Sequence, residues 1–140
     1  MSKRPRIVIT MGDPAGIGPE VSLRSLSCAE LLSVCQPILL GDRSALKSVA
    51  ERCDLEIPGQ FLTQSEFESV QENESSDPLL IDFQNVDLDE LRPGEISSRT
   101  GRASYDYIEQ AISWATASRV EGITTGPINK RALQLAGIDF

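Results

Sequence analysis

Short apolar runs alternate along this chain with segments whose apolar residues recur at helical spacing. Residues 6–10, 37–42 and 78–83 are nearly continuous in apolar character, which is typical of strands buried on both faces of a parallel sheet. A fourth β-branched run ends at Thr125. These runs predict four strands.

Helical spacing follows most of these runs. A helix is predicted after Pro19, which suits the first helical position; its apolar side would include Val21, Leu23, Leu26, Leu31 and Leu32. Residues 43–55 and 97–118 predict two further amphipathic helices, and a last one contains Lys130. Residues 58–78, rich in Gln, Ser, Glu and Asn, predict an irregular or weakly helical surface.

The alternation of strands and helices predicts the fold class. It indicates an α/β protein with α/β/α layers and a mainly parallel sheet, and 140 residues suit one domain. In such a sheet ligands bind beyond the carboxyl ends of the strands, so the loops after the strands are the first places to look for a site.

Charge and composition restrict the classes of function that this chain can have. The net charge is −8, and residues 54–95 hold twelve acidic residues against Arg92, so we expect a solvated acidic surface and no nucleic-acid binding. The first apolar run is too short for a signal peptide or a spanning helix, so we expect a cytoplasmic protein without membrane contact. There is no histidine, and the three cysteines, expected to be small buried hydrophobic residues, form no C-x-x-C pair.

The stretch MGDPAGIGPE, residues 11–20, is the first candidate site. Gly12, Gly16 and Gly18 allow backbone angles and close approaches that side chains would block, while Asp13 supplies a carboxylate. The helix that follows would offer backbone donors to a small polar ligand. The spacing is neither G-x-G-x-x-G nor that of a P-loop, and a tight strand-to-helix turn without a ligand remains the alternative.

The stretch ITTGPINK, residues 123–130, repeats this strand-to-helix arrangement. Thr124 and Thr125 supply hydroxyl groups, Gly126 exposes backbone, Asn129 supplies an amide and Lys130 supplies a cation. Together these groups suit a phosphate or a carboxylate. The alternative is an ordinary capped turn with a solvated lysine.

Other polar and aromatic residues are weaker candidates. Asp42 could face the same rim or simply form a Gly-Asp turn, and Arg99 and Arg102 could meet phosphate or lie in solvent beside a helix start capped by Ser98 or Thr100. For the aromatic residues of the long helix we expect packing roles: Tyr105, Tyr107 and Trp114.

Three of these segments carry a resemblance to a known family. RIVITMGDPAGIGPE, GRASYDYIEQAI and ITTGPINKRALQLAGI, in this order, resemble the N-terminal part of the 4-hydroxythreonine-4-phosphate dehydrogenases of vitamin B6 and pyridoxal 5′-phosphate biosynthesis. The resemblance implies an NAD- or NADP-dependent homodimer that oxidises 4-phosphooxy-threonine to a β-keto acid, which then loses carbon dioxide. It also implies the two-domain fold of the isocitrate and isopropylmalate dehydrogenases, with a divalent metal (Zn, Mg or Co) held by histidines.

The family pattern is incomplete in this sequence. The family's metal-binding histidines and its Gly-His-Thr-Glu stretch have no counterpart here, so no catalytic or metal-binding residue is carried over. We therefore expect residues 1–140 to be a single incomplete domain, inactive alone, that scaffolds the cleft for substrate or cofactor. Two alternatives remain: a truncated relative that binds a small anion, and an interaction protein that pairs through a bare sheet edge. The expected scaffolding residues are Gly12, Asp13, Gly16, Gly18, Thr125, Gly126, Asn129 and Lys130.

Overall fold

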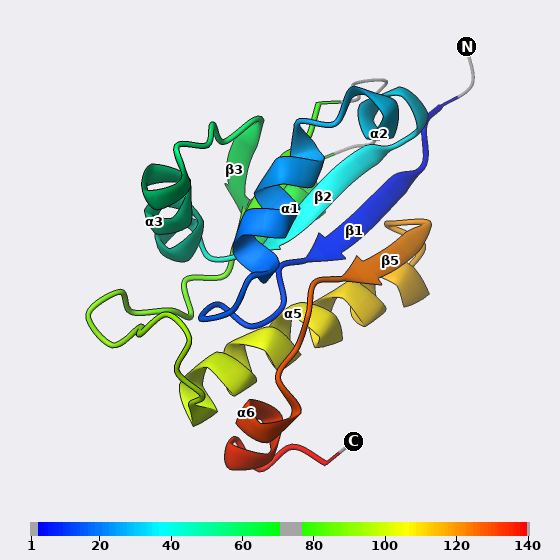
Figure 1. Cartoon of the computed structure of the whole chain (residues 1–140). Helices are drawn as coiled ribbons and strands as arrows, with labels where there is room; N and C mark the ends of the chain where they lie inside the picture. Colours follow the sequence, from blue (N-terminus) through cyan, green and yellow to red (C-terminus); the bar gives the residue numbers. More distant parts are fainter. Residues whose placement is uncertain (1–2, 71–76, 140) are drawn as a thin grey trace.

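A computed structural model of the chain describes residues 3–70 and 77–139 and contains a five-stranded parallel sheet (Figure 1). The strand order is β3-β4-β2-β1-β5, so β1 lies inside the sheet between β2 and β5. Each strand runs parallel to its neighbours, as the alternation of strands and helices predicts. The strands are β1 (Arg6–Thr10), β2 (Gln36–Gly41), β3 (Gln60–Thr63), β4 (Leu79–Asp82) and β5 (Gly122–Thr125).

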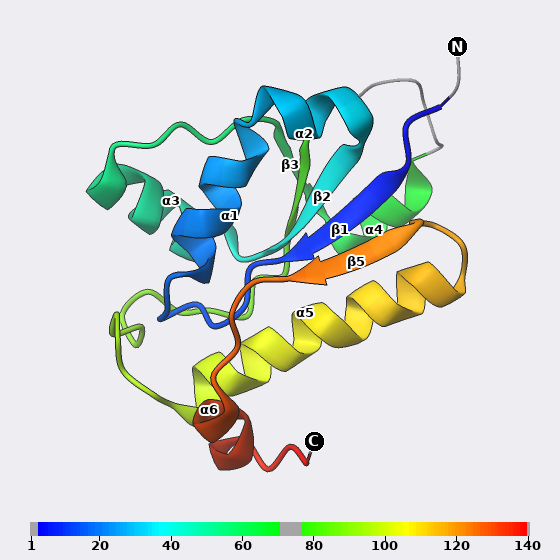
Figure 2. The ribbon, with the colours of Figure 1, turned by 45° about the vertical axis from the view of Figure 1, so that its right-hand side comes forward.

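Helices cover both faces of this sheet, which confirms the predicted α/β/α layers. The helix bounds are α1 (Gly18–Leu26), α2 (Ala29–Val34), α3 (Arg43–Cys53), α4 (Gln64–Ser69), α5 (Ser98–Thr116) and α6 (Lys130–Leu135). The first three lie on one face and α5 lies on the other, where it runs beneath β1 and β5 (Figures 1 and 2). The short α6 packs against the start of α5 in both views.

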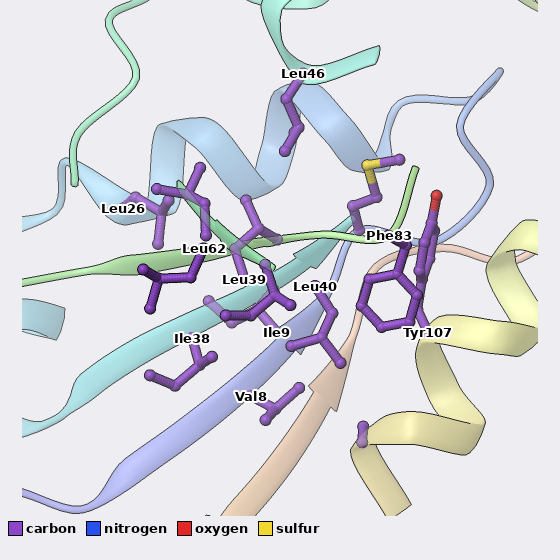
Figure 3. Close-up of a cluster of buried hydrophobic side chains, with 14 of the residues drawn as sticks. Val8, Ile9, Leu26, Ile38, Leu39, Leu40, Leu46, Leu62, Phe83 and Tyr107 are labelled. Carbon is purple, nitrogen blue, oxygen red and sulfur yellow. The ribbon is translucent and has the colours of Figure 1, made fainter. Parts of the chain in front are cut away.

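The core forms where the inner strands meet these helices. Val8 on β1 and Ile38, Leu39 and Leu40 on β2 are almost wholly buried, because a parallel strand with helices on both faces exposes neither side. Figure 3 shows these side chains leaving the sheet in two directions. The core continues to Tyr107 of α5, whose ring meets Phe83 edge-on at 5.0 Å between centroids.

Two predictions of local structure are wrong in part. Residues 58–78 were expected to be an irregular or weakly helical surface, and their described part contains the helix α4 but also the strand β3, which was not predicted. A capping box between Thr63 and Glu66 starts α4, and Phe67 anchors it in the core. Residues 71–76 of that segment lie outside the described residues. The single helix expected after Pro19 is two helices, because the chain leaves helical geometry at Cys28, whose backbone is extended.

The cysteine prediction holds in part. Cys35 is buried and Cys53 is partly buried against the core, but Cys28 is exposed in the break between α1 and α2. Burial raises the pKa of the Cys35 thiol. Among residues 3–70 and 77–139, no helix is both long enough and apolar enough to cross a membrane.

Candidate functional site

The two strand-to-helix junctions lie side by side because β1 and β5 are neighbouring parallel strands. Thr10 and Thr125 are in register at the ends of these strands. The Gly126 amide donates to the Thr10 carbonyl at 2.6 Å, and the Asp13 amide donates to the Pro127 carbonyl at 3.0 Å. The loop formed by residues 11–17, called the glycine loop below, is therefore hydrogen-bonded to the loop formed by residues 126–129, called the second loop.

Glycines allow the close approach of these loops. Gly12 has φ +75°, and a Cβ atom there would lie 2.3 Å from the Pro127 carbonyl oxygen. Gly18 begins α1, and a Cβ atom there would lie 1.9 Å from the Met11 carbonyl oxygen. Packing of backbone against backbone therefore requires glycine at both positions. A tight strand-to-helix turn without a ligand would require the same two glycines.

The loops enclose a hollow of about 210 Å³ at the carboxyl end of the sheet. A third segment, residues 94–96, closes one side of it, and the Gly94 amide donates to the Ala15 carbonyl at 2.7 Å. The exposed side chains of Ile17, Ile96 and Ile128, one from each segment, line it together with backbone. The hollow thus combines an apolar rim with the backbone of the glycine loop.

Asp13 is the buried carboxylate of this site. Its Oδ1 accepts from the Ala15 amide at 2.8 Å, which closes an Asx turn, and its Oδ2 accepts from the Thr100 hydroxyl at 3.4 Å. Burial raises the pKa of Asp13, and these two donors partly offset that effect because they stabilise the charged form. Asp13 therefore holds the glycine loop against the start of α5.

The candidate residues of the second junction are only partly gathered at the hollow. Asn129 lines it, and its side chain accepts from the Ala132 amide at 2.9 Å, so it caps α6. Thr125 and Lys130 are exposed and do not line the hollow. Because α6 has only six residues, its dipole adds little attraction for an anion.

Asp42 belongs to a separate buried cluster. Its Oδ1 accepts from the amides of Asn85 and Val86, and its Oδ2 accepts a very short hydrogen bond from the Tyr107 hydroxyl. It therefore fixes the segment after β4 to α5 and does not line the hollow. Trp114 has the expected packing role: it contacts Phe67 and is 2% exposed.

The arginines at the start of α5 face a different and wider groove of about 860 Å³. Arg99 pairs with Glu90, and Arg102 lies 3.8 Å from Asp106, so carboxylates already neutralise both in part. The helix start is capped by Ser97, which accepts from the Thr100 amide at 3.2 Å. The expected cap at Ser98 or Thr100 is therefore wrong by one to three residues.

Thr100 and residues 94–96 are site components that the sequence pattern does not reveal. Thr100 is separated from Asp13 by 87 positions, and a threonine in a first helical turn usually indicates capping. Residues 94–96 follow an acidic stretch and have no motif of their own. No signal in the local sequence identifies either contact.

The described part of this chain offers no group of side chains that fits a divalent metal. The sequence has no histidine, and the part of the chain that the structure describes contains no cluster of three or more His, Cys, Asp or Glu side chains that could hold an ion. We therefore assign no chemical step to a metal bound by these residues.

The buried Asp42 gives a testable pH dependence of stability. Burial, as the larger effect, and the nearby charge of Asp82 raise its pKa above the ordinary value of 3.8. The folded state therefore keeps this proton to a higher pH than the unfolded state, and the associated stabilisation is lost as the pH rises through the folded pKa. We expect the free energy of unfolding of the wild type, minus that of Asp42→Asn, to fall as the pH rises from about 4 through the raised pKa of the folded state. Urea unfolding at several pH values measures this difference, and a difference that grows with pH would contradict the assignment.

Comparisons with known proteins support the resemblance seen in the sequence. The family described as pyridoxal phosphate biosynthetic protein PdxA matches residues 33–140. A Symbiobacterium thermophilum protein with the provisional name D-threonate 4-phosphate dehydrogenase is 37% identical over all of this chain, and a Clostridium botulinum protein of the same provisional name is 33% identical. In both cases the chain spans 41% of the relative's length.

A solved structure agrees with this result. The 4-hydroxythreonine-4-phosphate dehydrogenase of Burkholderia phymatum superposes on 99% of the chain, and on 41% of its own, with a TM-score of 0.84 at 30% identity. The family match covers well over half of the chain, and the superposition includes both candidate loops. The chain therefore belongs to the pyridoxal phosphate biosynthetic protein PdxA family.

Proposed function

We propose that this chain forms one wall of the substrate cleft in an NAD- or NADP-dependent dehydrogenase that acts on a C4-phosphorylated hydroxy acid in the cytoplasm. The observation that carries the proposal is the hollow in which the glycine loop and the second loop meet at the carboxyl ends of β1 and β5. Ligands of open parallel sheets bind at such places. The proposed wall consists of Gly12, Asp13, Gly16, Gly18, Thr125, Gly126, Asn129 and Lys130, of which Asp13, Gly16 and Asn129 line the hollow itself.

The proposed reaction follows from the names of the relatives. In both 4-hydroxythreonine 4-phosphate and D-threonate 4-phosphate, a free hydroxyl lies beta to the carboxylate. Its oxidation transfers a hydride to the nicotinamide and releases a proton, which gives a β-keto acid that can lose carbon dioxide. The two substrates differ at C2, which carries an amine in one and a hydroxyl in the other. Measuring formation of reduced cofactor with each acid therefore shows which one is the substrate.

Within this reaction the chain would supply position and shape. The backbone of the glycine loop and the amide of Asn129 would orient the polar parts of the ligand, and the isoleucine rim would exclude water. The remaining groups, including any metal ligands, would come from parts of the homodimeric enzyme that this chain does not contain. We therefore expect the chain to be inactive alone.

Two proteins, the short chain and a chimera, test the proposal. The purified 140-residue chain is expected to form no NADH or NADPH from either phosphorylated acid, with Zn²⁺, Mg²⁺ or Co²⁺ added. A chimera in which this chain replaces the matched 41% of the Symbiobacterium thermophilum protein is expected to form reduced cofactor. Robust turnover by the short chain would refute its inactivity, and a folded chimera that turns over neither acid would refute the proposed wall.

Lys130, the residue that follows the second loop, tests whether this junction contributes to binding of the phosphorylated acid. In the chimera, Lys130→Ala is expected to raise KM for the phosphorylated acid, while Lys47→Ala, an exposed lysine of α3 outside the candidate site, serves as the matched control. If the short chain binds phosphate esters in calorimetry but the chimera is inactive, the chain is better described as a small-anion binding module.

A further inference from the structure

The start of α5 contacts both halves of the candidate site through two adjacent residues. Thr100 donates to Asp13 of the glycine loop at 3.4 Å. Gly101 faces α6, where a Cβ atom would lie 2.1 Å from the Ala132 carbonyl oxygen. One helical turn therefore contacts the glycine loop on one side and the helix that follows the second loop on the other.

These contacts form a closed ring of neighbours, three of which, Asp13, Pro127 and Asn129, line the hollow. Asp13 donates through its amide to Pro127 of the second loop, and Asn129 of that loop caps α6 at Ala132. Ala132 in turn lies against Gly101, next to Thr100. Each link joins backbone or buried atoms, so a displacement of one member is transmitted to the next.

Within this ring the contact between Thr100 and Asp13 joins two side chains. Thr100 and Asp13 are each 6% exposed, so their hydrogen bond is shielded from competing water. The Asx turn at Ala15 engages one carboxylate oxygen, and among the described residues Thr100 is the side chain that donates to the other. The two contacts together hold the carboxylate, and the Thr100 hydroxyl is the one that ties it to α5.

We propose that Thr100 is a positioning residue of the candidate site: through Asp13 it holds the glycine loop in the geometry that forms the hollow. Thr100 need not touch a ligand, because its single hydroxyl proton is shared between Asp13 Oδ2 at 3.4 Å and the Ser97 carbonyl at 3.2 Å. The claim about loop geometry stands by itself, and the claim that this geometry serves substrate binding rests on the proposed function.

The first experiment uses the 140-residue chain and three variants. Thr100→Val keeps the shape and removes the hydroxyl, Thr100→Ser keeps the hydroxyl, and Thr116→Val makes the same chemical change at the exposed far end of α5. Amide hydrogen exchange of residues 12–18 and the carboxyl ¹³C titration of Asp13 are measured by NMR, with the free energy of unfolding measured in parallel.

Thr100→Val is expected to speed exchange in the glycine loop by about tenfold, the equivalent of one hydrogen bond. It is also expected to raise the titration midpoint of Asp13, because a donor to the charged form is lost. Thr100→Ser and Thr116→Val are expected to behave as the wild type. Exchange that accelerates equally throughout the chain, an unchanged Asp13 titration, or failure of Thr100→Ser to restore both would each overturn the proposal.

The chimera separates this proposal from the proposed function. There Thr100→Val is expected to raise KM for the phosphorylated acid about tenfold with little change in kcat, and Thr100→Ser to restore it. If the loop loosens in the NMR experiment while KM does not change, the positioning of Asp13 stands and the substrate wall is wrong. If the loop does not loosen, the positioning proposal itself fails.

Discussion

Gly18→Ala is expected to lower the free energy of unfolding by about 3 kcal/mol, at the upper end of the range for overpacked sites. The added methyl group would lie 1.9 Å from the carbonyl oxygen of Met11 and 3.6 Å from the ring of Pro127. The oxygen belongs to the backbone that leads from β1 into the glycine loop, so it cannot move aside as a flexible side chain would. Alanine favours helices over glycine by up to about 1 kcal/mol, and the clash must exceed that gain.

Gly16→Ala is the matched control, because it makes the same change two residues earlier. There the nearest atom to an added Cβ is the Asp13 carbonyl oxygen at 3.5 Å, an ordinary contact. Its effect is expected to stay within about 0.5 kcal/mol. Urea unfolding followed by circular dichroism gives both values, and equal effects of the two variants would contradict the packing of the glycine loop described here.

Tyr107→Phe is expected to lower the free energy of unfolding by about 2 kcal/mol. The ring would remain packed edge-on against Phe83, so the loss comes almost wholly from the hydroxyl. Without it, the donors that the described residues still offer to the buried Asp42 carboxylate are the amides of Asn85 and Val86. A buried carboxylate that loses a donor loses much of the compensation for its desolvation.

Tyr105→Phe on the same helix is the control, with an expected effect within about 0.5 kcal/mol because this partly exposed tyrosine lies outside the Asp42 cluster. A double-mutant cycle with Asp42→Asn sharpens the result. Tyr107→Phe should cost much less when Asp42 is already neutral, because the two residues interact directly. A cost that does not depend on residue 42 would mean that the hydroxyl acts through another contact.

The sequence predicts the inner part of the sheet well for a physical reason. Residues of β1 and β2 are buried on both faces, so their composition is constrained at every position and forms continuous apolar runs. The edge strand β3 has the burial pattern exposed, intermediate, buried, intermediate, and its sequence is correspondingly ambiguous. For the same reason α4 could be expected only as a weakly helical segment, because its six residues bury Phe67 alone.

The candidate site likewise contains residues that can be predicted from the sequence and residues that cannot. Gly12 and Gly18 can be identified from the sequence because a backbone requirement restricts a position to one residue type. The bond between Thr100 and Asp13 cannot, because it depends on how α5 crosses the sheet. The expectation that Lys130 meets the ligand stays a prediction: the residue is exposed at the start of α6 and does not line the hollow.

The parallel arrangement of β1 and β5 also constrains how this protein can be made. Arg6 at the start of β1 and Glu121 just before β5 are hydrogen-bonded neighbours, yet they are 115 positions apart. During synthesis β1 can pair with β2 early, whereas its other edge stays open until β5 has left the ribosome. Until then the glycine loop lacks the second loop that shapes it, so the hollow can form only after residues 126–129 have been made.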